Sequence, residues 1–170
     1  MLRPLSVQRP YTAFFSGDPA IIPAPPEPAK DADEETKKTY ERQKKEHARL
    51  LELALATSQW QEICVPGDTI TTFKLRPLKT DEYGALCSML VNRVEQPFEV
   101  WKLAFQLALQ DCSPLLDGVE VKFTEHPRWG RIATTSFLDE IGLKPEVGAM
   151  VVMEIGQLVY KRSRDLDSKQ

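Results

Sequence analysis

The segment from residue 97 to residue 112, PFEVWKLAFQLALQDC, decides the fold. Its first proline fits the opening position of a helix, and large apolar residues then follow with few interruptions. Only Lys102, Gln106 and Gln110 form a narrow polar strip along this helix. A helix that is apolar around most of its circumference is buried, so the segment is predicted to form the centre of the hydrophobic core.

Further helices are predicted on either side of this segment. Before it, Thr80 or Asp81 can cap DEYGALCSMLVNRV at residues 81–94, where apolar residues recur at helical spacing. After it, FLDEIG at residues 137–142 predicts a helical turn. Proline then suits the first position of a last helix, predicted at Pro145–Arg162.

The β content is predicted to be small. Pro66-Gly67 marks a turn, and we expect a short hairpin of Gln61–Val65 against Thr69–Arg76. A short strand at Val119–Phe123 could pair with Leu115-Leu116 or with that hairpin. The predicted fold class is therefore mainly α with a small antiparallel β element (α+β).

Residues 1–30 contain seven of the thirteen prolines, a density that favours extended polyproline geometry. We expect this segment to be an extended arm outside the core. Its large apolar side chains need a surface, either on the parent domain or on a neighbouring subunit or partner. These side chains are Tyr11, Phe14, Phe15, Ile21 and Ile22.

The next segment, residues 31–60, has no proline or glycine and is predicted to be a long charged helix. Acidic residues lead it and complement the positive helix N-terminus. Its apolar residues lie near its end, so only the second half is expected to dock. A compact helical core domain with the short hairpin would follow at residues 61–162, and a polar tail at residues 163–170.

Composition limits the possible partners and compartments. The net charge of -3 makes nucleic acid an unlikely main partner. The longest apolar runs are far shorter than the roughly 20 residues of a membrane-spanning helix, and the opening residues lack the apolar block of a secretory signal. Three dispersed cysteines, Cys64, Cys87 and Cys112, fit reduced thiols of a cytoplasmic protein. We therefore expect a location in the cytoplasm.

No motif predicts catalytic, cofactor-binding or metal-binding residues, and we expect no enzymatic activity and no cofactor. The glycines are dispersed, without a nucleotide-binding spacing. His47 lies among charged residues and is expected to be solvated. Cys112, His126 and Asp117 could form a thiol-centred site, and the cysteines with His126 a zinc site, but no spacing signature supports either.

Two further groups of residues are candidates for binding a protein. Arg128, Trp129 and Arg131 lie in HPRWGR, predicted to be a loop, and Trp and Arg are enriched at interface hot spots. The purely structural interpretation of this segment is a capped turn with a half-buried tryptophan. Met150 and Met153 could supply an adaptable binding surface, although core packing is the simpler interpretation.

Three stretches within residues 72–165 follow one another in a characteristic order. They are TFKLRPLKTDEYGALCSML, WKLAFQLAL followed by LLDGVEVKF, and VGAMVVMEIGQLVYKRSRD after FLDEIG. This order of elements resembles that of small tail assembly proteins of long-tailed bacteriophages, often called tail assembly chaperones. It implies a mostly helical, non-enzymatic protein that keeps the apolar tape-measure protein soluble while tail-tube subunits assemble.

The leading hypothesis is a chaperone or adaptor that binds a helical client in the bacterial host cytoplasm. An alternative is a structural subunit of a virion neck, tail or other complex, anchored to neighbouring subunits through the N-terminal arm and present as a homo-oligomer. A further alternative is an inhibitor or regulator that binds a host protein. All three are protein-binding functions, so a protein is the expected partner in each.

Overall fold

A computed structural model describes residues 9–57, 59–92, 96–114, 119–140 and 145–167 of the chain. The chain forms two compact units, one of residues 1–15 with 72–170 and one of residues 16–71. About 51% of the structure is helical and 16% is in strands, which form small antiparallel sheets. The predicted mainly α fold with a small β element is therefore confirmed.

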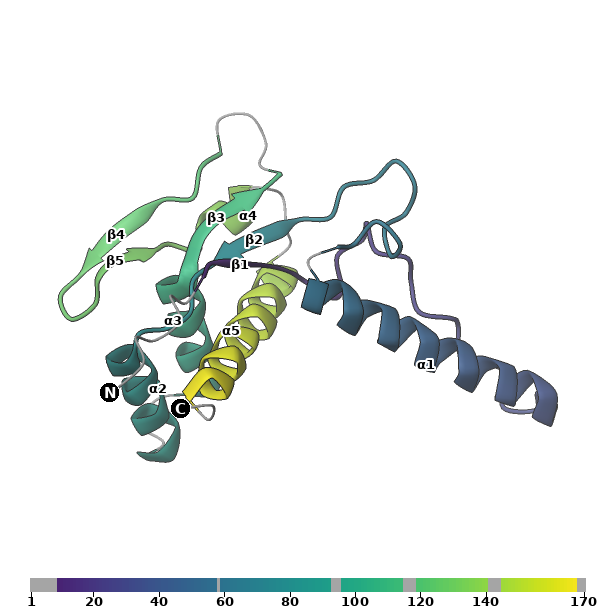
Figure 1. Cartoon of the computed structure of the whole chain (residues 1–170). Helices are drawn as coiled ribbons and strands as arrows, with labels where there is room; N and C mark the ends of the chain where they lie inside the picture. Colours follow the sequence, from purple (N-terminus) through teal and green to yellow (C-terminus); the bar gives the residue numbers. More distant parts are fainter. Residues whose placement is uncertain (1–8, 58, 93–95, 115–118, 141–144, 168–170) are drawn as a thin grey trace, which may run out of the picture. The chain divides into compact units, whose positions relative to one another are not determined.

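The first unit contains a three-stranded antiparallel sheet, shown in Figure 1. Strand β2 (Thr72–Leu75) lies in the middle, between β1 (Tyr11–Phe14) and β3 (Leu109–Ser113). Strands β1 and β2 pair from Tyr11 opposite Leu75 to Phe14 opposite Thr72. The sheet therefore joins three segments that are far apart in the sequence.

Four helices complete this unit: α2 (Thr80–Asn92), α3 (Pro97–Ala108), α4 (Phe137–Glu140) and α5 (Pro145–Asp167). Helix α3 packs along α5, and Gly156 of α5 lies directly against the backbone of Trp101. The predicted starts at Thr80, Pro97 and Pro145 are confirmed. Helix α5 continues beyond the expected Arg162, because no helix-breaking residue follows until the described part ends.

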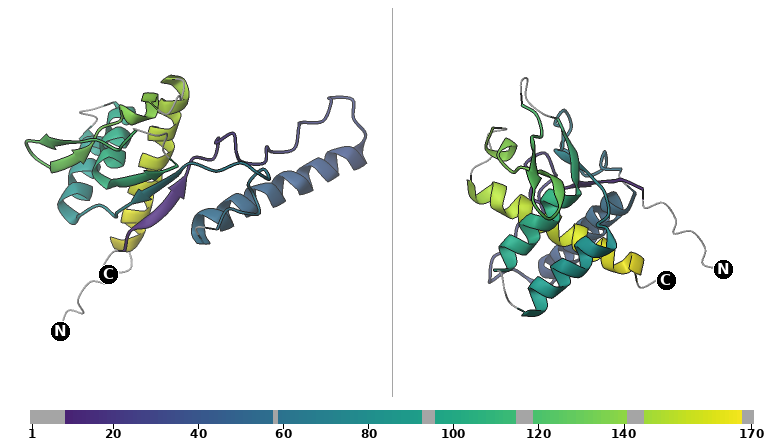
Figure 2. Two further views of the ribbon diagram at one scale, coloured as in Figure 1. Left: turned by 90° about the horizontal axis from the view of Figure 1, so that it is seen from above. Right: turned by 90° about the vertical axis from the view of Figure 1, so that its left-hand side faces the viewer.

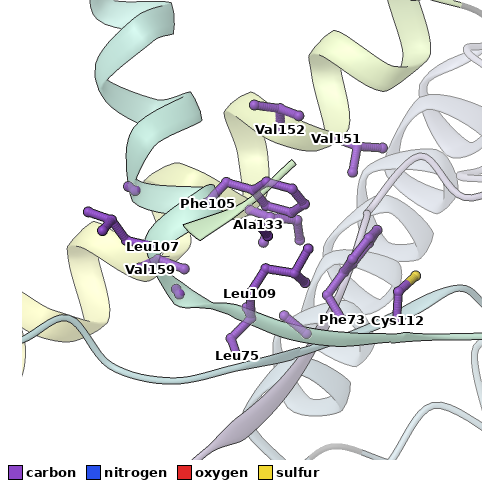
Figure 3. Packing of buried hydrophobic residues seen from close by; sticks show 14 of the residues in the cluster. Phe73, Leu75, Phe105, Leu107, Leu109, Cys112, Ala133, Val151, Val152 and Val159 are labelled. Carbon is purple, nitrogen blue, oxygen red and sulfur yellow. The ribbon is translucent and has the colours of Figure 1, made fainter. Parts of the chain in front are cut away.

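Figure 3 shows the core of this unit, where side chains from the sheet, from β5 and from two helices meet. Phe73 of β2 and Phe105 of α3 contact edge to face, with ring centroids 5.8 Å apart. The predicted central position of the 97–108 helix is confirmed. Its buried residues are Val100, Ala104, Phe105, Leu107 and Ala108.

The end of that helix and the expected first hairpin are different from the prediction. Residues 109–113 form β3 rather than more helix, because Leu109 turns to an extended conformation (φ -64°, ψ 127°) and pairs with β2. Segment 69–76 does contain a strand, but it does not pair with residues 61–65. The N-terminal strand β1 takes that place, and Cys64 instead forms a single bridge with Ile21.

A second, two-stranded sheet consists of β4 (Phe123–His126) and β5 (Gly130–Ala133). The strand predicted at residues 119–123 thus lies further along the chain, and the predicted loop HPRWGR contributes to both strands of a hairpin. The segment 69–76 of the expected hairpin does not pair with this strand. The other candidate partner, Leu115-Leu116, lies outside the described residues.

The second unit is built around α1 (Glu34–Thr57), which confirms the predicted long charged helix. An extended segment precedes α1, and residues 59–71 return beside that segment. The carboxylate of Asp18 joins the two by accepting from the N–H groups of Ala20 (2.8 Å) and Thr71 (2.9 Å). Ala54 is the buried residue of α1.

The expectation of an N-terminal arm outside the core is wrong for residues 11–15 and for Ile21. Phe15 (6% exposed) lies in the core of the first unit, Phe14 (1%) is also buried, and Ile21 (6%) is buried in the second unit. Prolines flank these residues but do not interrupt β1, so the backbone remains free to pair with β2. The units accordingly divide the chain after residues 15 and 71 rather than after residues 30 and 60.

Candidate protein-binding surfaces

The β4–β5 hairpin is held by a histidine within its turn. His126 Nδ1 accepts hydrogen bonds from the N–H groups of Arg128 (3.1 Å) and Trp129 (3.3 Å). Gly130 has a positive φ of 68°, a conformation that glycine adopts without strain. Because Nδ1 is an acceptor, the proton of the neutral ring is on Nε2. The residues after His126 are therefore fixed in place by its ring.

Two arginine–aromatic pairs lie on this hairpin. The guanidinium of Arg128 lies 4.3 Å from the centre of the Trp129 ring, and that of Arg131 lies 4.0 Å from the centre of the Phe123 ring. Both arginines are exposed, while both rings are half-buried. His126 also stacks on Trp129. Such flat, cationic surfaces are typical of protein interfaces.

The base of the hairpin is fixed to the core. Ile132 and Ala133 are buried, and Gln106 Nε2 of α3 donates to the Ala133 carbonyl oxygen (2.9 Å). The turn therefore presents Arg128 and Trp129 on a rigid base, which lowers the entropy cost of binding. Sequence reasoning identified Arg128, Trp129 and Arg131 but missed Phe123, which meets Arg131 only across the hairpin.

A second exposed surface lies on α5 and is formed by Ala149, Met150 and Met153, here called the methionine patch. Met150 is 52% exposed and Met153 is 40% exposed, one helical turn apart. The expectation that they pack in the core is wrong, because Val151, Val152 and Ile155 form the buried face of this helix. In Figure 1 the turn of the β4–β5 hairpin points away from α5, so the two surfaces are separate.

The N-terminal candidates pack within the chain. Phe14, Phe15 and Ile21 are buried, and only Ile22 is largely exposed (41%). Tyr11 is half-buried, with the Arg162 guanidinium 4.4 Å from its ring centre. Burial raises the pKa of the Tyr11 phenol to about 12, against the opposing effect of the Arg162 charge. These side chains are not free to anchor the protein to a neighbour.

The residues proposed for a thiol-centred site do not support one. Cys112 is buried in β3, and burial, with the nearby Asp111 charge, raises the pKa of its thiol to about 12. A nucleophilic cysteine needs the opposite shift. His126 uses Nδ1 within its own turn, and Asp117 lies outside the described residues. His47 is also not fully solvated as expected, since its Nε2 donates to the Ile22 carbonyl oxygen (2.8 Å).

Within the described ranges, no three His, Cys, Asp or Glu side chains are grouped closely enough to hold a metal ion. The described helices also include none with the length and apolar character needed to cross a membrane. Comparisons with protein families, with curated proteins and with solved structures gave no match.

Proposed function

We propose that this protein is a non-enzymatic tail assembly chaperone or adaptor of a long-tailed bacteriophage. It binds an apolar helical client, such as the tape-measure protein, in the bacterial host cytoplasm. The observation that carries this proposal is the methionine patch on α5, where Met150 and Met153 are exposed on a helix whose other face is firmly packed.

The chemistry of the patch suits a helical client. Methionine side chains are unbranched and polarizable, so they adapt to partners of different shape. An amphipathic helix is recognised through apolar residues spaced one turn apart, and Met150 and Met153 have the matching spacing. Two exposed basic residues, Lys161 and Arg164, follow towards the end of α5. A client helix with acidic residues beyond its apolar face would complement both parts.

The test is capture of a co-expressed tape-measure protein by the full-length chain. The double substitution Met150→Glu/Met153→Glu places two charges in the patch and is expected to abolish capture. Val91→Glu is the matched control, because Val91 is 80% exposed on α2, at a different site of the same unit. Unchanged capture by the double variant, or equal loss in the control, would contradict the proposal.

The hairpin is a second contact in this proposal. Trp129 has the flat ring and the neighbouring guanidinium of an interface hot spot, so Trp129→Ala is expected to weaken client binding by more than about 1 kcal/mol. A chaperone leaves its client before the particle is finished. Abundant recovery of the protein from purified particles by mass spectrometry would therefore favour a structural subunit instead.

A further inference from the structure

The segment Ile22–Pro28, IPAPPEP, has a backbone conformation fixed by its prolines. Prolines occupy positions 23, 25, 26 and 28, and each holds φ near -65°. Every residue that precedes a proline is also restricted to extended geometry. These restrictions favour a polyproline II helix with three residues per turn. Figure 2 shows the segment as an extended stretch of chain beside α1.

Contacts within the second unit hold this segment in place. At its start, Ile22 N–H donates to the Ile63 carbonyl oxygen (2.8 Å), and the Ile22 carbonyl oxygen accepts from His47 of α1 (2.8 Å). At its end, Ala32 N–H donates to Ala29 (3.0 Å) in the turn that leads into α1. The segment thus runs antiparallel to α1, anchored at Ile22 and followed by a turn that leads into α1.

The threefold repeat divides the segment into three ridges with different environments. Pro25 and Pro28 are partly buried and line a hollow with Tyr40 of α1. Pro26 and Glu27 border the same hollow but are exposed, as are Pro23 and Ala24. The ridge of Pro25 and Pro28 is therefore the most buried, and the other two ridges are exposed.

We propose that the ridge of Pro23 and Pro26 docks into an aromatic-lined groove on a partner protein. Aromatic grooves bind proline-rich segments because the polyproline helix is preformed and loses little entropy on binding. Here α1 removes the remaining freedom of the segment before any partner arrives. Such a groove contacts two of the three ridges of a polyproline helix. In this segment two ridges are exposed, and the third lies towards α1.

Charge specifies the partner further. Five carboxylates and one ammonium lie between Glu27 and Glu35. Of these, Asp33 and Glu35 line the same hollow as Pro26, so the Pro26 end of the ridge is acidic. A groove with a basic rim is complementary to this charge, and a groove with an acidic rim is repelled. This site lies in the second unit and involves another partner, so it does not depend on the client-binding proposal.

The test uses two probes, an isotope-labelled WW domain with basic residues beside its aromatic groove and an SH3 domain with an acidic groove. Full-length protein is titrated into each and followed by the indole N–H signals of the groove. We expect the WW signals to shift, and the double substitution Pro23→Ala/Pro26→Ala to weaken that binding at least about tenfold. Pro19→Ala/Pro66→Ala is the matched control, since these prolines are exposed in the same unit but outside the ridge.

Unshifted WW signals with the wild-type protein, or equal binding by the ridge variant, would overturn the proposal. Equally tight binding to the SH3 probe would overturn the assignment of a basic rim. Should the ridge variant lose its far-UV circular dichroism, Glu27→Lys takes its place, because it leaves every proline intact. That variant is expected to bind the WW probe several-fold more weakly, and unchanged affinity counts against the proposal.

Discussion

Among the described glycines, Gly156 of α5 leaves the least room for a side chain, because the backbone of Trp101 in α3 lies directly against it. A Cβ atom at this position would lie 2.1 Å from the Trp101 carbonyl oxygen and 2.7 Å from its carbonyl carbon. Both are backbone atoms, which cannot rotate away. Gly156→Ala is therefore expected to destabilise the first unit by roughly 1–3 kcal/mol or more, although alanine favours helix. Denaturant unfolding followed by tryptophan fluorescence measures the change.

Gly148 of the same helix provides the control for this substitution. It is also buried, but a Cβ atom there would meet only Leu138 Cβ at 3.9 Å, an ordinary contact distance. Gly148→Ala is expected to be neutral or to stabilise by up to about 1 kcal/mol through helix propensity. If both variants unfold at the same denaturant concentration, the close approach at Gly156 is not what limits the helix pair.

Cys112 is expected to be the least reactive of the three thiols. With its pKa raised from 9.0 to about 12, its thiolate fraction at pH 8 is about a thousandfold lower than that of an ordinary thiol. Labelling with a disulfide reagent and mass spectrometry should modify the half-buried Cys64 and Cys87 first. Fast labelling of Cys112 in the folded protein would show that β3 opens.

The raised pKa of the Cys112 thiol also predicts that the folded protein loses stability at alkaline pH. A group whose pKa is higher in the folded state stabilises that state below its unfolded pKa, and this contribution disappears as pH rises through the folded value. For Cys112 the stability is complete below about pH 9 and falls towards pH 12. Tyr11 acts in the same direction, because its phenol pKa is also raised. Unfolding free energy that stays constant across this range would contradict the prediction.

The link between β2 and α2 depends on a buried ion pair. Arg76 donates two hydrogen bonds to Glu82 (2.8 and 2.7 Å), and Lys79 N–H donates a third (2.8 Å). The Glu82 side chain is 3% exposed and that of Arg76 is 25% exposed. Glu82→Gln would leave the Arg76 charge poorly compensated, so a loss of about 2 kcal/mol is expected in urea unfolding.

Comparison with an exposed ion pair of the same geometry distinguishes the effect of burial on stability from the effect of hydrogen-bond geometry. Arg49 and Glu46 of α1 make the same two-bond contact (2.9 and 2.6 Å) on the surface. Because water screens this pair, Glu46→Gln is expected to leave the unfolding curve unchanged. A comparable loss in both variants would mean that hydrogen-bond geometry, rather than burial, determines the contribution of these pairs.

Strand β1 is predicted to be essential to the first unit rather than a detachable end. Phe15, the residue after β1, belongs to the core cluster of this unit and is 6% exposed, so Phe15→Ala should cost about 3–5 kcal/mol. Ile22→Ala, at a residue 41% exposed, should cost far less. Thermal unfolding measures both. A Phe15 variant as stable as the wild type would restore the view of this segment as an arm.

The helices were predictable from sequence because their signals are local. Pro97 and Pro145 begin helices by fixing φ, and the charged pairs of α1 support it without tertiary contacts. The pairing of β1, β2 and β3 was not, because these strands are distant from one another in the sequence. Leu109 continues a helical pattern in the sequence, and only the edge of β2 makes it a strand residue. Tyr11–Phe14 likewise became β1 through β2, in a segment whose prolines favoured an arm.

The candidate protein-binding surfaces show the same division between features that depend on local sequence and features that depend on the fold. Arg128 and Trp129 could be selected by residue type, whereas the contact of Arg131 with Phe123 requires the hairpin register. Met150 fits the apolar spacing of Val147, Val151 and Ile155 in the sequence, so periodicity placed it in the core. It lies at the edge of that stripe, and only the packing of α5 decides which edge residues remain exposed.

At the scale of the whole molecule, the second unit is an insertion between two strands that are neighbours in the sheet. Strands β1 and β2 pair directly, yet residues 15–71 separate them in the sequence. Closing so long a segment costs loop entropy before the pairing can stabilise the sheet. The register itself needs no inserted unit, because extending it by one residue would place Phe15 opposite Thr71.

Replacing residues 16–70 with Asn-Gly should therefore leave the first unit folded. Asn-Gly favours the tight turn that matches the twist of paired strands, and β1 and β2 would become a local hairpin. A more local contact also predicts faster refolding in stopped-flow measurements. The shortened protein should still capture the tape-measure client through α5 but should no longer bind the WW probe. If it fails to fold while Gly148→Ala folds normally, the first unit depends on the inserted residues for its stability.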